Sequence, residues 1–236
     1  MDLSVIIPTL NEEKYIARTI QHAKRMESGE NEIEYILVDS GSKDKTVEAS
    51  NGLFNLIHVD PSLAGLKYRS LNEGAQMSKG QVVLFLDADC QVPRGYDQLI
   101  LDAVKKKNVI GGAFEFAMER GGPVHKLAEW FNRTRYRLTQ NYFGDQGIFC
   151  LKNVFDEIGG YPDQPIMEAA YFCQMLRKKG KLKLIKQPLV SSIRRFEKGG
   201  VFNVLLKDGW IWVQFLLGMD ISKYAKSYWN ENQKGF

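Results

Sequence analysis

Two groups of carboxylates follow apolar runs within the first ninety residues. One run, 35–38, ends at Asp39, and the other, 82–86, ends at Asp87-Ala88-Asp89. Apolar runs of this length between helical segments predict parallel strands that are covered on both faces, and ligands bind at the carboxyl ends of such strands. Two carboxylates at this spacing can hold a hard divalent cation, which can neutralise a diphosphate. The pattern predicts an enzyme that handles a nucleotide diphosphate.

The elements that must position these carboxylates alternate between strand and helix. The expected order is strand 3–8, helix 12–26, a strand ending at residue 39, a helix from 44, strand 54–59, helix 69–77 and a strand ending at 87. We expect Asn11 and Asp44 to be N-caps and Gly80 to end its helix. This alternation predicts an α/β fold with a doubly wound, mostly parallel sheet and helices on both faces.

The second half has a looser pattern. We expect helices over 96–106, 124–139, 167–179 and 201–219, strands over 108–116 and 182–185, and a turn, short strand and short helix over 144–160. No linker or repeat interrupts the chain. We therefore expect a single domain over 1–236, with a nucleotide-binding half (1–90) and an acceptor-facing half (91–236) that contains an apolar C-terminal helix.

Composition excludes several classes. The net charge of +4 is spread along the sequence, so we expect no nucleic-acid partner. The three cysteines include no CxxC pair, which favours a reducing, cytoplasmic compartment over a disulfide framework. We see no signal peptide and no apolar stretch long enough to span a bilayer. No GxGxxG follows the first strand, which argues against a dinucleotide-binding domain.

Three segments in order resemble the family 2 glycosyltransferases. They are Val5-Ile6-Ile7-Pro8-Thr9-Leu10-Asn11-Glu12-Glu13, Val38-Asp39-Ser40-Gly41-Ser42-Lys43-Asp44-Lys45-Thr46 and Leu84-Phe85-Leu86-Asp87-Ala88-Asp89. Later segments, 144–149 and 158–162, resemble the same family. The chain looks closest to a bacterial branch of small, soluble members, one of which is associated with arsenosugar biosynthesis. The resemblance implies a GT-A type fold, a UDP-sugar donor, Mg²⁺ or Mn²⁺, and inverting transfer to an acceptor hydroxyl.

The resemblance also implies donor-site residues. Those expected beside the nucleoside are Pro8, Asn11, Glu12 and Asp39, the last as an acceptor for the base. Asp39 could instead be a turn residue at a strand end.

Further residues would approach the rest of the donor. Gly41 and Ser42 would let the backbone come close to the nucleotide. Lys67 or Arg69 would lie near the base or phosphates, Asp87 would approach the ribose, and Asp89 would bind the metal.

The chain departs from the family pattern where the general base is expected. Family members carry Glu-Asp at the start of a helix facing the acceptor, but this chain has Glu168-Ala169. Inverting transfer needs a carboxylate near the attacking hydroxyl, so Glu168 and Asp145 are the candidate bases. Glu168 could also be a helix-start residue, and Asp145 a turn residue. The alternative is a catalytically impaired protein that binds a nucleotide sugar.

Two further features allow more than one interpretation. Arg194 and Arg195 follow a predicted strand, and either could bind the diphosphate or belong to a solvated basic loop. The helix 201–219 contains Trp210 and Trp212 and is flanked by lysines. It could lie on the inner membrane surface as a peripheral contact, or pack in the core or in a homodimer.

Overall fold

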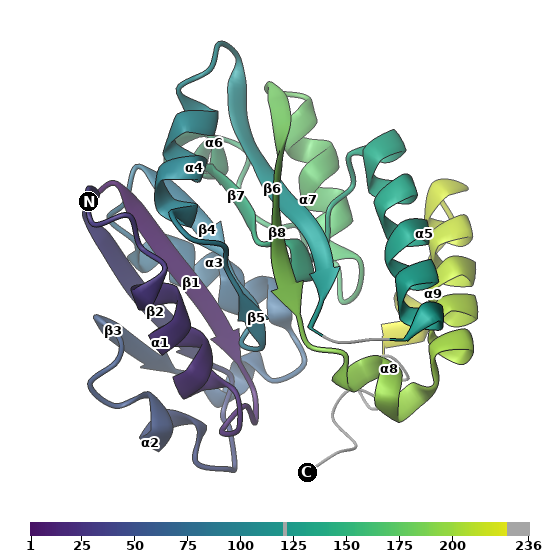
Figure 1. Ribbon diagram of the computed structural model, residues 1–236, viewed down its shortest axis with the longest axis horizontal. Helices are drawn as coiled ribbons and strands as arrows, with labels where there is room; N and C mark the ends of the chain where they lie inside the picture. The colour runs from purple at the N-terminus through teal and green to yellow at the C-terminus, as the bar shows by residue number, and fades with distance from the viewer. Residues whose placement is uncertain (120–121, 226–236) are drawn as a thin grey trace.

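The computed structural model describes residues 1–119 and 122–225, except for the side chains of Val124 and Arg195. The strands are β1 (Leu3–Thr9), β2 (Ile33–Asp39), β3 (Leu56–Val59), β4 (Val82–Phe85), β5 (Cys90–Gln91), β6 (Val109–Met118), β7 (Ile148–Leu151) and β8 (Lys181–Ser191). Within the described residues they form one eight-stranded sheet in the order β3-β2-β1-β4-β7-β6-β8-β5 (Figure 1).

Helices surround this sheet. The α-helices are α1 (Ile16–Arg25), α2 (Thr46–Ser50), α3 (Lys67–Met77), α4 (Tyr96–Val104), α5 (Pro123–Thr139), α6 (Lys152–Glu157), α7 (Glu168–Arg177), α8 (Arg194–Gly199) and α9 (Val201–Leu216). Short 3₁₀ turns are η1 (Pro61–Leu63), η2 (Gly144–Gln146) and η3 (Ser222–Tyr224). None of the helices within the described ranges has both the length and the apolar character needed to cross a membrane.

The first half of the sheet is parallel, as the sequence predicts. β1 pairs in parallel with β2 and β4, and β2 with β3. Thr9 lies opposite Asp39, and Ile6 lies opposite Phe85, so the segments that follow β1, β2 and β4 leave the sheet at one edge. This register brings the three sequence motifs together.

The second half of the sheet is mixed. β7 runs antiparallel to both β4 and β6, whereas β6 and β8 are parallel and β5 is antiparallel to β8. The sheet is therefore mostly parallel, and its second half is not a simple continuation of the alternating pattern.

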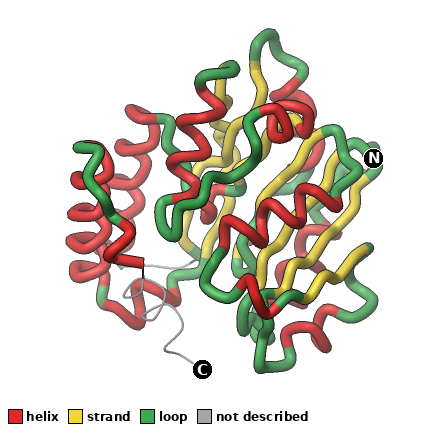
Figure 2. The backbone as a smooth tube through the Cα atoms, turned by 180° about the vertical axis from the view of Figure 1, so that it is seen from behind, coloured by secondary structure: helices red, strands yellow, loops and turns green. Residues whose placement is uncertain are grey.

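Apolar side chains bury both faces of the sheet. Along β1, Val5 and Ile7 pack with α1 and α4, while Ile6 points to the other face and packs with α3. Alternate residues of a strand point to opposite faces, so a continuous apolar strand needs helices on both sides. Figures 1 and 2 show these helix layers, with α5 and α9 side by side at one end of the molecule.

The first helix begins later than predicted. Asn11 is not an N-cap; it has a left-handed backbone (φ 57°), and α1 begins at Ile16. The backbone amides of Glu12 and Glu13 donate to the side chains of Thr46 and Asp44. The expected first turn of the helix is instead a loop bound to its neighbour.

Three other expected boundaries are wrong. Gly80 does not end α3, which stops before Ser78; its amide donates to Ser4 Oγ, and a side chain there would meet Ser4 at 2.5 Å. β8 continues past Ile185 because a register shift accommodates the polar segment that includes Pro188. Residues 194–199 form α8 rather than a loop.

Candidate active site

Hydrogen bonds from side chains join the loops that follow β1 and β2. Ser42 Oγ accepts from the Asn11 amide at 2.8 Å, and Asn11 Oδ1 accepts from the Lys43 amide at 2.8 Å. Thr46 Oγ1 accepts from the Glu12 amide at 2.7 Å. These bonds fix the sheet edge on which the remaining side chains stand.

Asp39 holds the turn after β2. Its side chain is fully buried, and Oδ1 accepts from the amides of Gly41 (3.0 Å) and Ser42 (2.8 Å). Oδ2 accepts from Thr9 Oγ1 (2.9 Å) and Ser42 Oγ (2.6 Å). Gly41 has φ 84°, and a side chain there would lie 2.8 Å from Pro61. The carboxylate therefore organises the loop, and its expected contact with a base stays a prediction.

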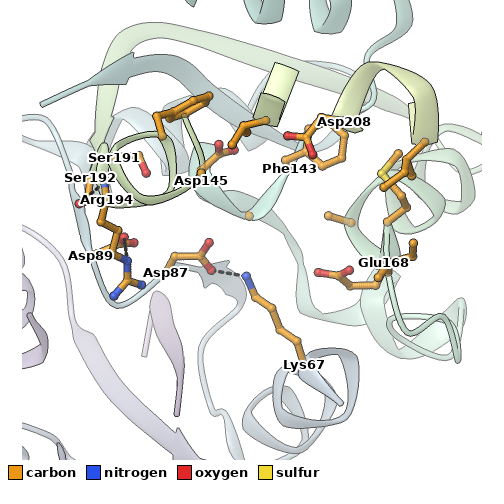
Figure 3. Close-up of a pocket in the computed structure, with 18 of the residues that line it drawn as sticks. Lys67, Asp87, Asp89, Phe143, Asp145, Glu168, Ser191, Ser192, Arg194 and Asp208 are labelled. Carbon is orange, nitrogen blue, oxygen red and sulfur yellow. Dashed lines mark hydrogen bonds and ion pairs between the residues drawn. The ribbon is translucent and has the colours of Figure 1, made fainter. Parts of the chain in front are cut away.

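Asp87 is paired with a lysine from α3. Lys67 Nζ lies 2.5 Å from Asp87 Oδ1 (Figure 3). The pair is covered by η2, where a Cβ on Gly144 would lie 2.8 Å from Lys67 Nζ and 2.9 Å from Asp87 Oδ2. The absence of a side chain at Gly144 lets the backbone approach this ion pair.

Arg194 joins the two other acidic groups of the sheet edge. Its Nη1 and Nη2 donate to Glu12 at 2.6 and 2.7 Å, while Nε lies 2.9 Å from Asp89 Oδ2. Its guanidinium carbon stands 4.7 Å from the centre of the Tyr15 ring. The planar fork of arginine suits this bidentate contact with a carboxylate.

Negative charge exceeds positive charge at this edge. Glu12, Asp87 and Asp89 face Lys67 and Arg194. Burial raises the pKa of Asp89 to about 6; Arg194 opposes the shift, and Asp87 and Glu12 reinforce it. Burial lowers the pKa of Arg194, but the bonds to Glu12 and the charge of Asp89 outweigh it and hold that pKa above its ordinary value.

The opposite wall carries Glu168. This residue is the first of α7 and is 9% exposed; burial raises the pKa of its carboxyl, and the charge of Lys67 partly opposes the shift. Its side chain points towards the open centre, across from Asp87 and Lys67 (Figure 3). Asp145 lies between the two walls, on η2. Ala169 also borders the space.

These walls enclose a cavity of about 760 Å³, a size typical of small-molecule sites. Eight predicted site residues line it: Pro8, Glu12, Lys67, Asp87, Asp89, Asp145, Glu168 and Arg194. The fold therefore brings the donor-side and acceptor-side candidates into one space.

Other predicted residues are not in the lining. Asn11, Asp39, Gly41 and Ser42 form the supporting loops behind it. Arg69 is exposed, and its side chain donates to Tyr68 Oη. It lies two positions after Lys67 on α3, and residues two apart on a helix face different directions, so Arg69 does not share the inward direction of Lys67. The side chain of Arg195 lies outside the described residues.

Sequence reasoning missed two contributors. Tyr15 stacks on Arg194, and Arg135 of α5 places its guanidinium 4.0 Å from the Phe143 ring centre and 5.0 Å from that of Trp212. Arg135 also lines the cavity. The aromatic-rich pattern of 124–139 indicates packing but does not show which cation faces inwards.

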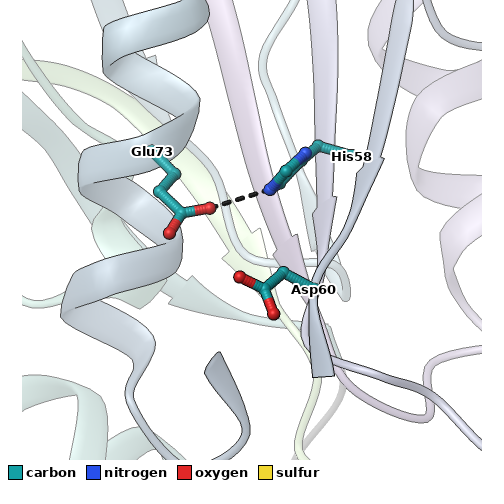
Figure 4. Close-up of side chains that lie close together, drawn as sticks. All are labelled: His58, Asp60 and Glu73. Atoms are coloured by element: carbon teal, nitrogen blue, oxygen red, sulfur yellow. Dashed lines mark hydrogen bonds and ion pairs between the residues drawn. The ribbon is translucent and has the colours of Figure 1, made fainter. Parts of the chain in front are cut away.

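A separate cluster of possible metal ligands lies on β3, α3 and the segment after β3. His58 Nε2 is 2.8 Å from Glu73 Oε2, and Asp60 lies nearby (Figure 4). Asp60 also accepts from the Ser62 amide at 2.8 Å and caps η1, and these bonds lower its pKa. None of the three lines the cavity. Their contacts tie an edge strand to α3, and this is the role we assign to them.

Comparison with known proteins gives a consistent family. The profile described as Glycosyl transferase family 2 matches residues 4–155. Glycosyltransferase AglE of Haloferax volcanii is 26% identical over 174 residues, which are 70% of this chain and 57% of that protein. The chain thus spans little more than half of that relative.

Solved structures share the fold. The S. aureus TarS 1–349 structure in complex with UDP-GlcNAc has a TM-score of 0.65 and 18% identity, covering 81% of this chain and 58% of that one. Mannosyltransferase PcManGT from Pyrobaculum calidifontis, in complex with GDP-Man and Mn²⁺, has a TM-score of 0.61 and 20% identity, covering 80% and 56%. These likenesses confirm the GT-A type fold; the arsenosugar branch stays a prediction.

Proposed function

Because the chain belongs to glycosyl transferase family 2, we propose that it is a metal-dependent, inverting glycosyltransferase that moves a sugar from a UDP-sugar to an acceptor hydroxyl. The observation that carries the proposal is the cavity itself. One wall presents paired carboxylates and cations, and the opposite wall presents a buried glutamate. A charged donor and a general base need these two surfaces to face each other.

In this proposal residues 1–90 bind most of the donor and residues 91–236 face the acceptor. Pro8 and Glu12 lie beside the nucleoside, and Asn11, Asp39, Gly41 and Ser42 hold the loops that shape its site. Lys67 and Arg194 offset charge on the diphosphate, with Arg195 as a further candidate. Guanidinium and ammonium groups suit phosphate oxygens.

The residues present fit a divalent cation. Asp89 lies beside Asp87 and Glu12, and burial, reinforced by the charges of these two carboxylates, raises its pKa. A hard cation prefers such oxygen ligands, and Asp89, with Asp87 beside it, would hold Mg²⁺ or Mn²⁺. The solved PcManGT complex contains Mn²⁺. When bound, the ion would stabilise negative charge on the departing diphosphate.

The proposed transfer is a single displacement. The acceptor oxygen attacks the anomeric carbon, the bond from that carbon to the diphosphate oxygen breaks, and UDP leaves with the electron pair. Glu168 takes the proton of the acceptor hydroxyl, since its raised pKa makes it a stronger base near neutral pH. Asp145 is the second candidate for this proton.

The impaired-binder alternative is not favoured. Ala169 removes the usual base position, but the adjacent Glu168 points into the cavity from the same helix start. We propose a cytoplasmic reaction, which agrees with three free, buried cysteines.

Calorimetric titration with UDP, with and without Mn²⁺, tests the donor site. We expect Mn²⁺-dependent UDP binding that exceeds GDP and ADP binding and is weakened at least tenfold in Asp89→Asn. Asp102→Asn, an exposed change on α4, is the matched control. Binding of none of these nucleotides by the folded protein would overturn the proposal, and equal binding of GDP would overturn the preference for UDP.

A further inference from the structure

Exposed apolar side chains gather at one end of the molecule. Among the described residues, fourteen large hydrophobic side chains are exposed, and eleven belong to α5, α9 or the three residues after α9. They are Leu127, Trp130, Phe131, Leu138, Phe202, Leu206, Trp210, Val213, Leu216, Leu217 and Met219. We call this set the α5–α9 surface. Isolated exposed apolar residues are ordinary, but a set of this size on two adjacent helices indicates an interaction site.

The pattern follows helical periodicity on both helices. Leu127, Trp130, Phe131 and Leu138 fall on one side of α5. On α9, the exposed stripe through Leu206, Trp210 and Val213 lies opposite a buried stripe through Ile211 and Phe215.

Within the described part of the chain, α9 therefore has two apolar sides. One is packed against the rest of the protein, and the other is exposed. Leu206 is 74% exposed and Leu138 is 80% exposed. Such side chains contribute nothing to the core that the described residues build.

Positive charge is concentrated in the same segments. Residues 123–139 and 194–216 hold eight Lys and Arg against three Asp and Glu, a net charge of +5. The whole chain has a net charge of +4, so the remaining residues sum to −1. Part of this charge is paired within the protein, since Arg194 bonds to Glu12 and Asp89, and Arg133 and Arg137 contact Glu115, whereas Lys126 and Lys198 are exposed. An apolar face bordered by basic residues matches an anionic lipid surface.

The same two helices also wall the cavity. Asn132 and Arg135 of α5 and Lys207, Ile211 and Trp212 of α9 line it, as does Phe131, which is at the same time part of the α5–α9 surface. The surface and the mouth of the cavity are continuous at Phe131.

We propose that the α5–α9 surface docks on an anionic lipid bilayer and turns the acceptor side of the cavity towards that bilayer. Neither helix is long and apolar enough to cross a membrane, but both can lie in the headgroup region with Trp130 and Trp210 inserted. The statement that the acceptor side of the cavity faces the bilayer rests on the proposed function. Binding of the α5–α9 surface to lipid does not depend on that function.

Charge favours the bilayer over a second copy of this chain. A two-fold dimer through the α5–α9 surface would bring the basic residues that border it, such as Lys126 and Lys198, close to those of the second copy, which is unfavourable. An anionic bilayer supplies the opposite charge and covers apolar side chains on both helices at once.

The tryptophans provide a label-free test. Trp130 and Trp210 are exposed on the surface and Trp212 is buried beside them; the fourth, Trp229, lies outside the described residues. We expect sedimentation of the full chain with vesicles containing 30 mol% phosphatidylglycerol in phosphatidylcholine, with quenching of emission by brominated lipid. Binding to pure phosphatidylcholine should be at least fivefold weaker.

A matched pair of variants locates the contact. Leu206→Glu/Trp210→Glu should bind these vesicles at least tenfold more weakly, whereas Leu56→Glu/Val59→Glu, two exposed apolar residues of β3, should bind like the parent. Far-UV circular dichroism should show that both variants fold.

Three outcomes would overturn the docking proposal: no vesicle binding by the parent chain, equal loss in the two folded variants, or a stable dimer that Leu206→Glu/Trp210→Glu dissociates without any vesicle binding. UDP titration separates this failure from failure of the proposed function. A chain that binds UDP but not vesicles overturns the docking alone, and a chain that binds vesicles but no nucleotide overturns the function alone.

Discussion

The two walls of the cavity use their side chains in opposite ways. At the strand edge, Glu12, Asp87 and Asp89 meet Lys67 and Arg194 within the protein, and the strands beneath are buried on both faces. On the helical wall, α9 buries Ile211 and Phe215 but leaves Leu206 and Trp210 in solvent. One wall pairs its charged side chains with one another, and the other leaves its apolar surface open.

The two walls are therefore stabilised by different interactions. The strand-edge wall is arranged before any ligand arrives, since its loops and ion pairs hold one another in place. The α5–α9 surface gains its largest apolar burial only when something outside the described residues covers it. The contrast between the two walls makes four measurable predictions.

The largest effect is expected for Glu168→Gln, which tests whether chemistry belongs to the helical wall. Removing the base should lower transfer by about 10³-fold, while UDP binding at the strand edge stays unchanged. Turnover and UDP titration are measured on the same preparation, and Asp145→Asn, which removes the second candidate base, is compared with Glu168→Gln. A larger loss of transfer activity in Asp145→Asn would identify Asp145, on η2, as the general base instead of Glu168.

A pair of leucines compares burial in the two regions. Leu37→Ala on β2 removes a fully buried side chain and should lower the free energy of unfolding by about 3 kcal/mol. Leu206→Ala on the α5–α9 surface should change it by less than about 0.5 kcal/mol. Urea unfolding measures both. Equal losses would show that the chain itself covers Leu206.

The pH dependence of stability tests the buried charge at the strand edge. The pKa of Asp89 is raised from 3.8 to about 6, so the folded protein binds this proton more tightly than the unfolded chain. The contribution of Asp89 to stability is therefore greatest below pH 4, falls as pH rises and is lost above pH 6. The difference is about 3 kcal/mol.

Asp89→Asn should remove this slope. Unfolding curves of the parent and variant at several pH values between 4 and 7 give the difference directly. If the two stability profiles run parallel over this range, Asp89 does not titrate there.

The smallest effect is expected for Gly144→Ala. A methyl group there would lie within 3 Å of Lys67 Nζ and Asp87 Oδ2, and both can move because they end flexible side chains. We expect UDP affinity to fall by about tenfold, or about 1.4 kcal/mol, with stability nearly unchanged. Gly122→Ala, where nothing lies within 4 Å, is the control by the same titration.

The strand edge could be predicted from sequence because its signals are local. Apolar runs that stop at Asp39 and Asp87 mark strand ends, and parallel pairing brings those ends together. Local signals failed at Asn11, whose side chain bonds to Lys43 across two loops instead of capping a helix. Asparagine is common both as a helix N-cap and in contacts between loops, so the residue type alone does not tell the two roles apart.

The rest of the site depends on contacts that no short pattern encodes. Arg194 bonds to Glu12 across 182 positions, and the outward direction of Arg69 depends on how α3 is rotated against the sheet. The apolar pattern of 201–219 predicted a helix correctly, but burial depends on what packs against each side. The pattern alone therefore could not distinguish core side chains from exposed ones.

The bond between Arg194 and Glu12 also bears on how the protein is made. The chain leaves the ribosome from its N-terminus, so Glu12 and Asp89 emerge well before the residue that pairs with them. At ordinary rates of synthesis, about 10 s separate Asp89 from Arg194. During that interval the nascent sheet edge carries an acidic cluster without its guanidinium counter-ion, which arrives only with Arg194.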